Sequence, residues 1–156
     1  WAASGSIIQP LLELLLDEPY FSKAAPKSTG RELFNGLWLE EKLYKLGQEL
    51  AVVDVQATLL RVTVDSIVNA ISKASKPSEV YVCGGGAHNK AFMKGLQARL
   101  SNCSILSTAE LGIDPDWVEA IAFAWMAKQT SEGRTIDTTP FTGAAQATVL
   151  GGIYKA

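Results

Sequence analysis

Three consecutive glycines, Gly84 to Gly86, stand where an apolar segment gives way to a helical pattern. The segment Glu79 to Cys83 is rich in β-branched residues and predicts a buried strand, and a helix is predicted from Lys90 to Leu100. Glycines accept positive φ angles and lack a Cβ, so a base or phosphate can approach the backbone. The helix start that follows offers unpaired N–H groups. The stretch matches neither G-x-G-x-x-G nor G-x-x-x-x-G-K-S/T. It therefore fits a nucleotide-binding turn as well as a plain structural turn.

Two polar side chains accompany these glycines. Asn89 is well placed to cap the helix that begins at Lys90. His88 is the only histidine of the chain, and we interpret it as a polar loop residue rather than a catalyst.

Glu119 is the second candidate for chemistry. It is the only charged residue between Asp116 and Lys128, in a segment that is apolar on every side and therefore predicts a buried helix. Asp114 is expected to cap this helix, and Pro115 suits its first position. A buried carboxylate needs a partner, a ligand or a proton. Glu119 is thus either a structural acid paired with an Arg or a backbone N–H, or a site carboxylate at the edge of a cleft.

The remaining pattern predicts the elements that position these residues. A short buried helix is expected from Ile7 to Leu16, and a helical pattern resumes at Arg31, with Ser28 or Thr29 as its cap. From Leu50 to Ser75, apolar residues at spacings of three and four predict a long helix whose opposite side carries Asp54, Arg61 and Asp65. With a second short strand near 104–107, the order is that of an α/β domain with helices packed on a short mixed sheet. The pattern after Gly133 decides neither strand nor helix.

Composition bounds the class of protein. The chain has 156 residues, 47% of them hydrophobic, which is enough for one domain with a real core. A formal net charge of -2 without a basic block argues against nucleic acid or an anionic membrane as partner. No apolar run reaches the roughly 18 residues of a membrane span, and no signal peptide is expected. Two cysteines indicate a reduced, cytoplasmic compartment, and one histidine without a CxxC motif leaves a zinc site without enough ligands.

Four blocks of sequence resemble the anhydro-N-acetylmuramic acid kinase family. The first combines Asp17-Glu-Pro-Tyr-Phe21 with Ala25-Pro-Lys-Ser-Thr-Gly-Arg-Glu-Leu-Phe-Asn35. The second, Val82 to Asn89, is similar to that family's adenosine-side glycine loop. The third is Glu110-Leu-Gly with Asp116 to Ala127, and the fourth runs from Thr142-Gly-Ala to Val149-Leu-Gly. The blocks follow the family's order over nearly the whole chain.

The resemblance implies an ATP-dependent sugar kinase with the two-lobed, ribonuclease H-like fold of actin and hexokinase. Such an enzyme hydrolyses the 1,6-anhydro bond of anhydro-N-acetylmuramic acid and transfers the γ-phosphoryl group to O6. The product is N-acetylmuramic acid 6-phosphate, in the recycling of cell-wall fragments. ATP and Mg²⁺ are the implied cofactors, with the metal bridging phosphates. An aspartate activates the attacking water.

The family's phosphate loop and its Asp-Thr-Gly-Pro-Gly-Asn-type segment, which carries the general base, do not occur in this sequence. We therefore interpret residues 1–156 as a single domain, the C-terminal nucleotide-binding lobe portion of a larger kinase, and expect it to be inactive alone. Its implied partners are an amino-sugar substrate, the N-terminal lobe of the same polypeptide and a second copy in a homodimer.

The resemblance carries over to few residues. Gly84, Gly85 and Gly86 would lie along the adenosine and α-phosphate side, and Asn89 would cap the helix or touch the nucleotide. Glu119 would help order the sugar or the attacking water, and no metal ligand is assigned. The loop from Lys27 to Arg31 is either a substrate or lobe contact or a solvated loop. Two rival functions remain, another sugar kinase of the superfamily and a non-catalytic nucleotide-binding regulator.

Overall fold

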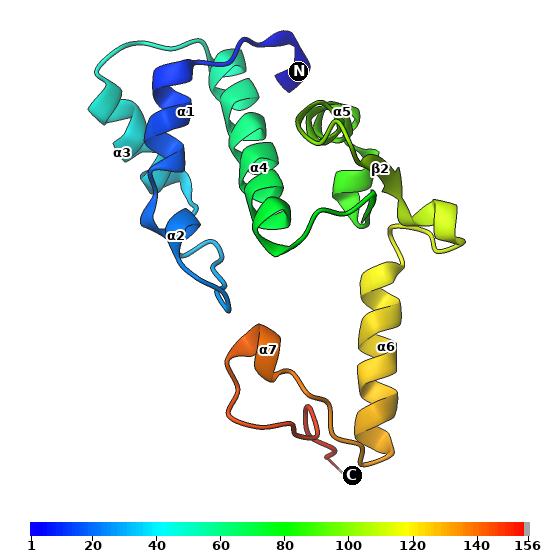
Figure 1. The fold of residues 1–156 in the computed structure, drawn as a ribbon. Helices are drawn as coiled ribbons and strands as arrows, with labels where there is room; N and C mark the ends of the chain where they lie inside the picture. The colour runs from blue at the N-terminus through cyan, green and yellow to red at the C-terminus, as the bar shows by residue number, and fades with distance from the viewer. Residues whose placement is uncertain (155–156) are drawn as a thin grey trace.

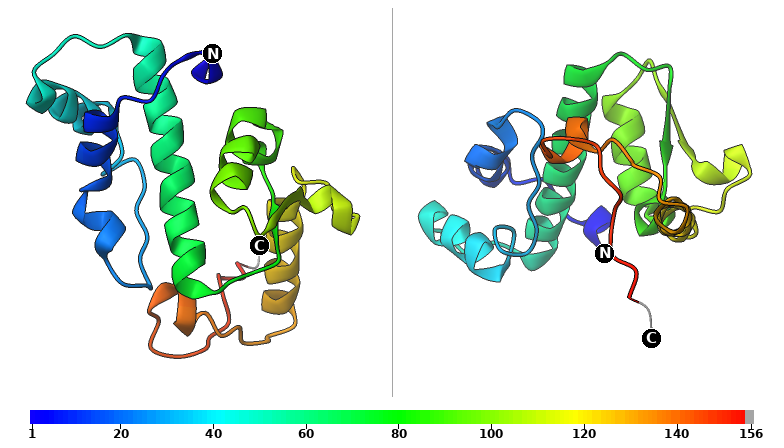
Figure 2. Two further views of the ribbon diagram at one scale, coloured as in Figure 1. Left: turned by 45° about the horizontal axis from the view of Figure 1, so that its top comes forward. Right: turned by 90° about the horizontal axis from the view of Figure 1, so that it is seen from below.

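The computed structural model describes residues 1–154 as helices around one small sheet. The longest helix, α4, runs between the other elements, with α1, α2 and α3 on one side and the sheet with α5 on the other (Figure 1). The segment that contains α6 and α7 leads away from the sheet (Figures 1 and 2). The elements in chain order are the 3-10 helix η1 (Ala2–Ser4), α1 (Gln9–Leu16), α2 (Pro19–Ser22), α3 (Gly36–Leu46), α4 (Val52–Ala74), β1 (Glu79–Val82), η2 (Gly85–His88), α5 (Lys90–Arg99), β2 (Ser104–Ser107), η3 (Thr108–Leu111), α6 (Val118–Ser131) and α7 (Thr139–Thr142).

The first helix confirms the prediction for residues 7–16. Pro10 lies in its first turn, where a missing N–H costs nothing. Leu11, Leu12 and Leu15 are buried and pack with Val62 of α4 in the first of two core clusters. A helix this short is marginal by itself, so this apolar contact with α4 is what holds it.

The prediction that a helix resumes at Arg31 under a Ser28 or Thr29 cap is wrong. The helix begins at Gly36, and Asn35 caps it by accepting a hydrogen bond from Trp38 N–H at 2.9 Å. The cause lies just upstream, where the Glu32 carboxylate accepts hydrogen bonds from Gly30 N–H at 2.6 Å and from Thr29 Oγ1 at 3.2 Å. These bonds hold 31–34 in turns and bends, and leave the capping position to Asn35.

Helix α4 confirms the long predicted helix, but it is buried on two sides rather than one. Val62 faces the cluster shared with α1, whereas Val64 and Val68 form a second cluster with Phe92 and Leu96 of α5. Asp65 was expected on the solvated side and is instead only 5% exposed. A helix between two layers has no wide polar side, so a polar residue there has to be buried with partners.

The described residues form a sheet of two parallel strands, where a mixed sheet was expected. Glu79 pairs with Ser104 and Val82 with Ser107, and α5 makes the crossover between the strands. An isolated antiparallel bridge joins Ile136 to Thr148. Because the two strands are parallel, both end at the same edge, where the glycine bend and η3 begin.

Helix α6 exists as predicted, but the expectation that it is buried is wrong for the described residues. The side chains of Trp117, Ile121, Phe123 and Trp125 are 62%, 51%, 62% and 52% exposed. No residue of the helix is buried, and only the tail returns to it, through the Thr130 hydroxyl donating to Leu150 O. None of the described helices is long and apolar enough to cross a membrane.

Candidate functional site

The glycine bend leaves its backbone bare. Gly84 has φ +69°, and its N–H group donates to Pro115 O at 2.8 Å. A Cβ on Gly84 or Gly85 would meet no atom within 4 Å, and one on Gly86 would lie 3.4 Å from the Phe92 ring. Within residues 1–154, neither Gly85 N–H nor Gly86 N–H donates a hydrogen bond, because they precede the first donors of η2. The bend thus presents two free donors in open space.

Asn89 is the helix cap that the sequence predicts. Its Oδ1 accepts hydrogen bonds from Ala91 N–H and Phe92 N–H, both at 3.1 Å. This corrects the expectation of unpaired N–H groups at the start of α5, since the cap occupies two of them. The free donors lie earlier, in the glycines. In the described part of the chain the Asn89 amide nitrogen has no partner, so the same side chain can cap the helix and donate to a ligand.

A hollow of about 280 Å³ lies beside the bend, on its α4 side. Its walls combine apolar side chains with amide and hydroxyl groups from α4 and from the start of α5, an arrangement suited to a flat, partly polar ring. The lining residues are Gln56, Leu59, Leu60, Thr63, Gly86, Asn89 and Phe92.

The bend also contacts the segment that precedes α6. His88 Nε2 lies 2.8 Å from Asp116 Oδ1, and these side chains are 60% and 59% exposed. Together with the bond from Gly84 N–H to Pro115 O, this pair joins two of the sequence blocks that resemble the kinase family. The sequence placed His88 in the polar loop and missed its pairing, because a separation of 28 residues leaves no local periodicity to read.

Glu119 is exposed in the first turn of α6 and forms no ion pair or hydrogen bond with the described residues. Its interpretation as a buried carboxylate is therefore wrong in this structure, whereas its role in chemistry remains a prediction. No residue that lines the hollow beside Gly86 belongs to α6.

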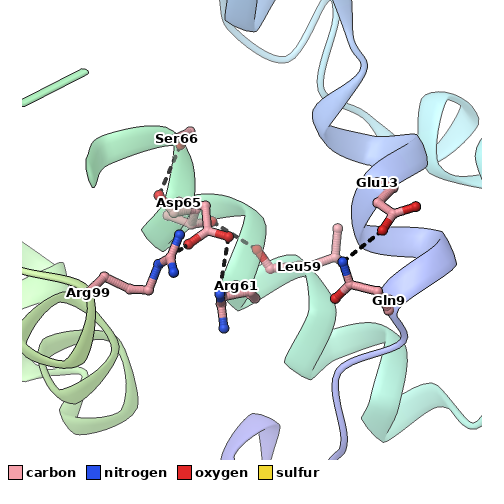
Figure 3. A network of polar contacts seen from close by, with 8 residues as sticks. Gln9, Glu13, Leu59, Arg61, Asp65, Ser66 and Arg99 are labelled. Carbon is pink, nitrogen blue, oxygen red and sulfur yellow. Dashed lines mark hydrogen bonds and ion pairs between the residues drawn. The ribbon is translucent and has the colours of Figure 1, made fainter. Parts of the chain in front are cut away.

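The buried acid of the chain is Asp65. Arg61 Nε donates to its Oδ2 at 2.9 Å, and Arg99 Nε lies 2.9 Å from Oδ1 as an ion pair without hydrogen-bond geometry (Figure 3). Arg61 belongs to α4 and Arg99 ends α5, so this carboxylate joins the two helices that flank the hollow. The requirement that a buried acid find partners is met here, by a residue that the periodicity placed on the solvated side.

Many polar groups of the loop from Lys27 to Arg31 form hydrogen bonds with nearby residues of the chain. Lys27 Nζ donates to Tyr20 O at 2.8 Å and to Phe21 O at 3.1 Å, and lies 4.7 Å from the centre of the Tyr20 ring. The hydrogen bonds that Glu32 accepts from its own backbone N–H, from Gly30 and from Thr29 lower the pKa of its carboxyl group. Arg31 has no ion pair or hydrogen bond within the described residues. Its side chain and the exposed Ser28 hydroxyl, which forms no hydrogen bond in the described residues, are left to contact a substrate or another lobe.

A second acid of the same region fixes α2 against α3. Glu18 accepts a hydrogen bond from Trp38 Nε1 at 2.9 Å and lies 3.3 Å from Lys42 Nζ. The Trp38 hydrogen bond and then Lys42 lower the pKa of Glu18, against the opposing effect of burial. Both acids thus hold the fold of the first sequence block.

No metal site is built from these side chains. Within residues 1–154 no group of three or more His, Cys, Asp or Glu residues could hold a metal ion. Cys83, at the end of β1, is an exposed free thiol, and Cys103 is a buried one.

A strand, an open glycine bend and a capped helix beside a hollow form an α/β unit, a layout that is typical of nucleotide-binding proteins. The family model for anhydro-N-acetylmuramic acid kinase matches residues 1–156, and the chain belongs to this family.

Named relatives agree with this assignment. The chain is 48% identical to the anhydro-N-acetylmuramic acid kinase of Shewanella pealeana over 156 residues, which is 100% of the chain and 42% of the relative. It is 49% identical to the enzyme of that name from Psychrobacter arcticus, over 97% of the chain and 36% of the relative. It is 48% identical to the enzyme of that name from Thiobacillus denitrificans, over 100% of the chain and 42% of the relative. The chain thus spans about two fifths of the length of these relatives.

Proposed function

We propose that this chain is the C-terminal, nucleotide-binding lobe portion of an ATP-dependent kinase with the two-lobed, actin-like fold. The complete protein hydrolyses the 1,6-anhydro bond of anhydro-N-acetylmuramic acid and phosphorylates O6, giving N-acetylmuramic acid 6-phosphate in cytoplasmic cell-wall recycling. Family membership and the names of the relatives support this function. The structural observation that carries it is the open bend, with its two free N–H groups, beside the hollow on α4.

The residues of this chain fit a nucleotide in three ways. Gly85 and Gly86 offer N–H groups to a phosphate or ribose oxygen, and no Cβ blocks the approach to Gly85. The amide nitrogen of Asn89 offers a further donor. Leu59, Leu60 and Phe92 supply apolar walls for a base.

Phosphoryl transfer needs positioning and neutralisation of charge more than it needs covalent chemistry by the protein. Mg²⁺ would supply that neutralisation, and none of the residues described here is assigned as its ligand. Glu119 is exposed at the start of α6 and would orient the sugar or the attacking water. The general base, the phosphate loop and the partner lobe are assigned to the part of the polypeptide by which the relatives are longer.

A substrate panel tests this function. The complete protein, given ATP and Mg²⁺, should convert anhydro-N-acetylmuramic acid to its 6-phosphate and should take up one oxygen from ¹⁸O-labelled water, as measured by mass spectrometry. Turnover of a free hexose or of glycerol instead would assign the chain to another kinase of the superfamily. Binding of ATP without turnover of any sugar would indicate a regulator.

A second arm of the same assay addresses Glu119. Glu119→Gln should lower kcat by about 10²- to 10⁴-fold if the carboxylate acts in acid–base chemistry. Because glutamine has nearly the same size and shape as glutamate, the midpoint of thermal unfolding should change little. The matched control is Glu41→Gln, an exposed acid on α3. Unchanged turnover in Glu119→Gln would return this residue to a structural role.

A further inference from the structure

The segment that begins at Ile113 is attached to the rest of the described chain by few polar contacts. One is local, from Ile113 N–H to Thr108 O at 3.1 Å. The other two come from the glycine bend, namely the bond from Gly84 N–H to Pro115 O and the pair of His88 with Asp116, both at 2.8 Å. Two of these three attachments thus lie at the candidate nucleotide site.

Helix α6 continues from this attachment without support along its sides. None of its residues is buried, and it leads away from the sheet (Figures 1 and 2). Within the described residues, its polar contacts with the sheet and the bend lie at its start, and the tail that follows it lies near Pro26, since a Cβ on Gly143 would be 3.7 Å from Pro26 Cγ. Glu119 lies in its first turn, only three residues beyond Asp116.

The geometry of the attachment is specific. Its positive φ lets Gly84 turn its N–H group toward Pro115, which is buried between exposed neighbours. Asp116 is itself held in place, because its N–H group donates to Asp114 Oδ1 at 2.9 Å. Its carboxylate lies 2.8 Å from His88 Nε2 and accepts a hydrogen bond from it when this ring nitrogen carries a proton, and the charge of the acceptor strengthens that bond.

An exposed ion pair usually contributes little to stability. The pair of His88 with Asp116 differs in its place in the fold, because the described residues make only one other polar contact between these two segments, from Gly84 N–H to Pro115 O. A small interaction at such a point changes orientation more than it changes the free energy of unfolding.

We propose that His88 and Asp116 are positioning residues that latch α6 to the glycine bend. The latch keeps one geometry between a nucleotide on Gly85 and Gly86 and the acid Glu119. Its loss loosens the start of α6, where Glu119 lies, and so lowers the rate of transfer, whereas the groups that hold the nucleotide stay in place. The latch itself follows from the contacts, and only its effect on turnover depends on the proposed function.

The test compares His88→Ala, Asp116→Ala and the double variant in the complete protein. His88→Gln is the conservative variant, because its amide nitrogen can replace Nε2 as a donor. Lys128→Ala is the matched control, since it removes an exposed ion pair with Glu132 at the other end of α6.

The first readout needs no nucleotide. Amide hydrogen exchange at Gly84 and at Ile121, whose N–H group donates to Trp117 O at 2.8 Å, should become about two- to five-fold faster in either single variant, the range of an exposed ion pair. The double variant should add nothing further, because both single changes break the same contact. His88→Gln should restore slow exchange, and Lys128→Ala should leave it unchanged.

The second readout is turnover with ATP and the anhydro sugar. We expect kcat to fall by about two- to five-fold in each single variant, with KM for ATP unchanged within a factor of about two, because the donors on the bend remain. Unchanged exchange in His88→Ala, or additive effects in the double variant, would overturn the latch.

The two proposals fail separately. Faster exchange in the variants of a protein that phosphorylates no sugar would keep the latch and remove the proposed function. Normal turnover in the unmodified protein, with amide exchange the same in the variants, would keep the proposed function and remove the latch.

Discussion

At the scale of single residues, Asn89 combines two tasks that substitution can separate. Its Oδ1 caps α5, whereas its amide nitrogen has no partner in the described chain, and the residue lines the hollow. One atom thus serves the fold, and the other is available to a ligand.

Asn89→Ala should cost about 1 kcal/mol of stability through loss of the cap and should also weaken ATP binding. Asn89→Asp keeps an oxygen for the cap but loses the donor and adds charge near the phosphates. It should therefore retain the unfolding midpoint while Kd for ATP rises about 10- to 150-fold, which corresponds to the roughly 1.5–3 kcal/mol of a hydrogen bond to a charged group. Calorimetric titration and thermal unfolding of the complete protein measure the two effects. Equal ATP affinity in Asn89→Asp and the unmodified protein would leave Asn89 as a cap alone.

Asp65 is an acid in the core, and two arginines are the partners of its carboxylate. The carboxylate is 5% exposed and contacts arginines from α4 and α5. Asp65→Ala should lower the local opening free energy of these helices by about 1–3 kcal/mol, because their shared carboxylate is lost. The loss stays in this range because both arginines can turn to water. Hydrogen exchange of the buried Leu96 amide reports this change. The exposed acid variant Glu41→Gln provides the comparison, and equal protection in both would show that the Asp65 cluster contributes nothing.

At the scale of elements, α4 and α5 approach each other so closely that one glycine is required between them. A Cβ on Gly95 would lie 2.9 Å from Val64 Cγ2, and Val64 is only 2% exposed. A β-branched side chain in a helix has one preferred rotamer, so Val64 cannot turn away.

Gly95→Ala should therefore destabilise the pair by about 1–3 kcal/mol, although alanine is favoured over glycine inside a helix by about 1 kcal/mol. Adding Val64→Ala should recover part of the loss, because the new methyl group then fills vacated space. Gly36→Ala is the control, since nothing lies within 4 Å of its Cβ and its φ is not positive. Thermal unfolding midpoints of the three variants and the unmodified protein form the measurement. A stabilising Gly95→Ala would show that the helices have room to separate.

The sequence predicted those elements whose evidence is local. The spacing of Val53, Ala57, Leu60 and Val64 is sufficient for α4, and the β-branched run is sufficient for β1. The start of α3 was missed because Glu32 and Asn35 compete with earlier caps through contacts that periodicity does not contain. The expected burial was wrong for both acids. Asp65 is buried because α4 packs between two layers, and the burial of Glu119 depends on what covers α6. The bend and its cap were predictable, whereas the His88 pairing was not.

At the scale of the whole molecule, α6 presents more apolar surface than one helix ordinarily leaves in water. Its Trp117, Ile121, Phe123 and Trp125 side chains are all at least half exposed. The relatives are more than twice as long as this chain, since it covers 42% of one of them. We expect the rest of the same polypeptide to cover α6, because burying each such side chain is worth about 1.5–3 kcal/mol.

Phe123→Ser should then destabilise the complete protein by about 3–5 kcal/mol, the cost of emptying a buried aromatic position. Tyr44→Ser is the control, because Tyr44 is 88% exposed on α3 and should tolerate the change. Thermal unfolding over a hundred-fold range of protein concentration identifies the cover. A loss that is independent of concentration assigns it to the same polypeptide, whereas a loss that grows on dilution assigns it to a second copy in a homodimer. An unfolding midpoint in Phe123→Ser equal to that of Tyr44→Ser would mean that α6 stays in water, so that its apolar residues need another explanation.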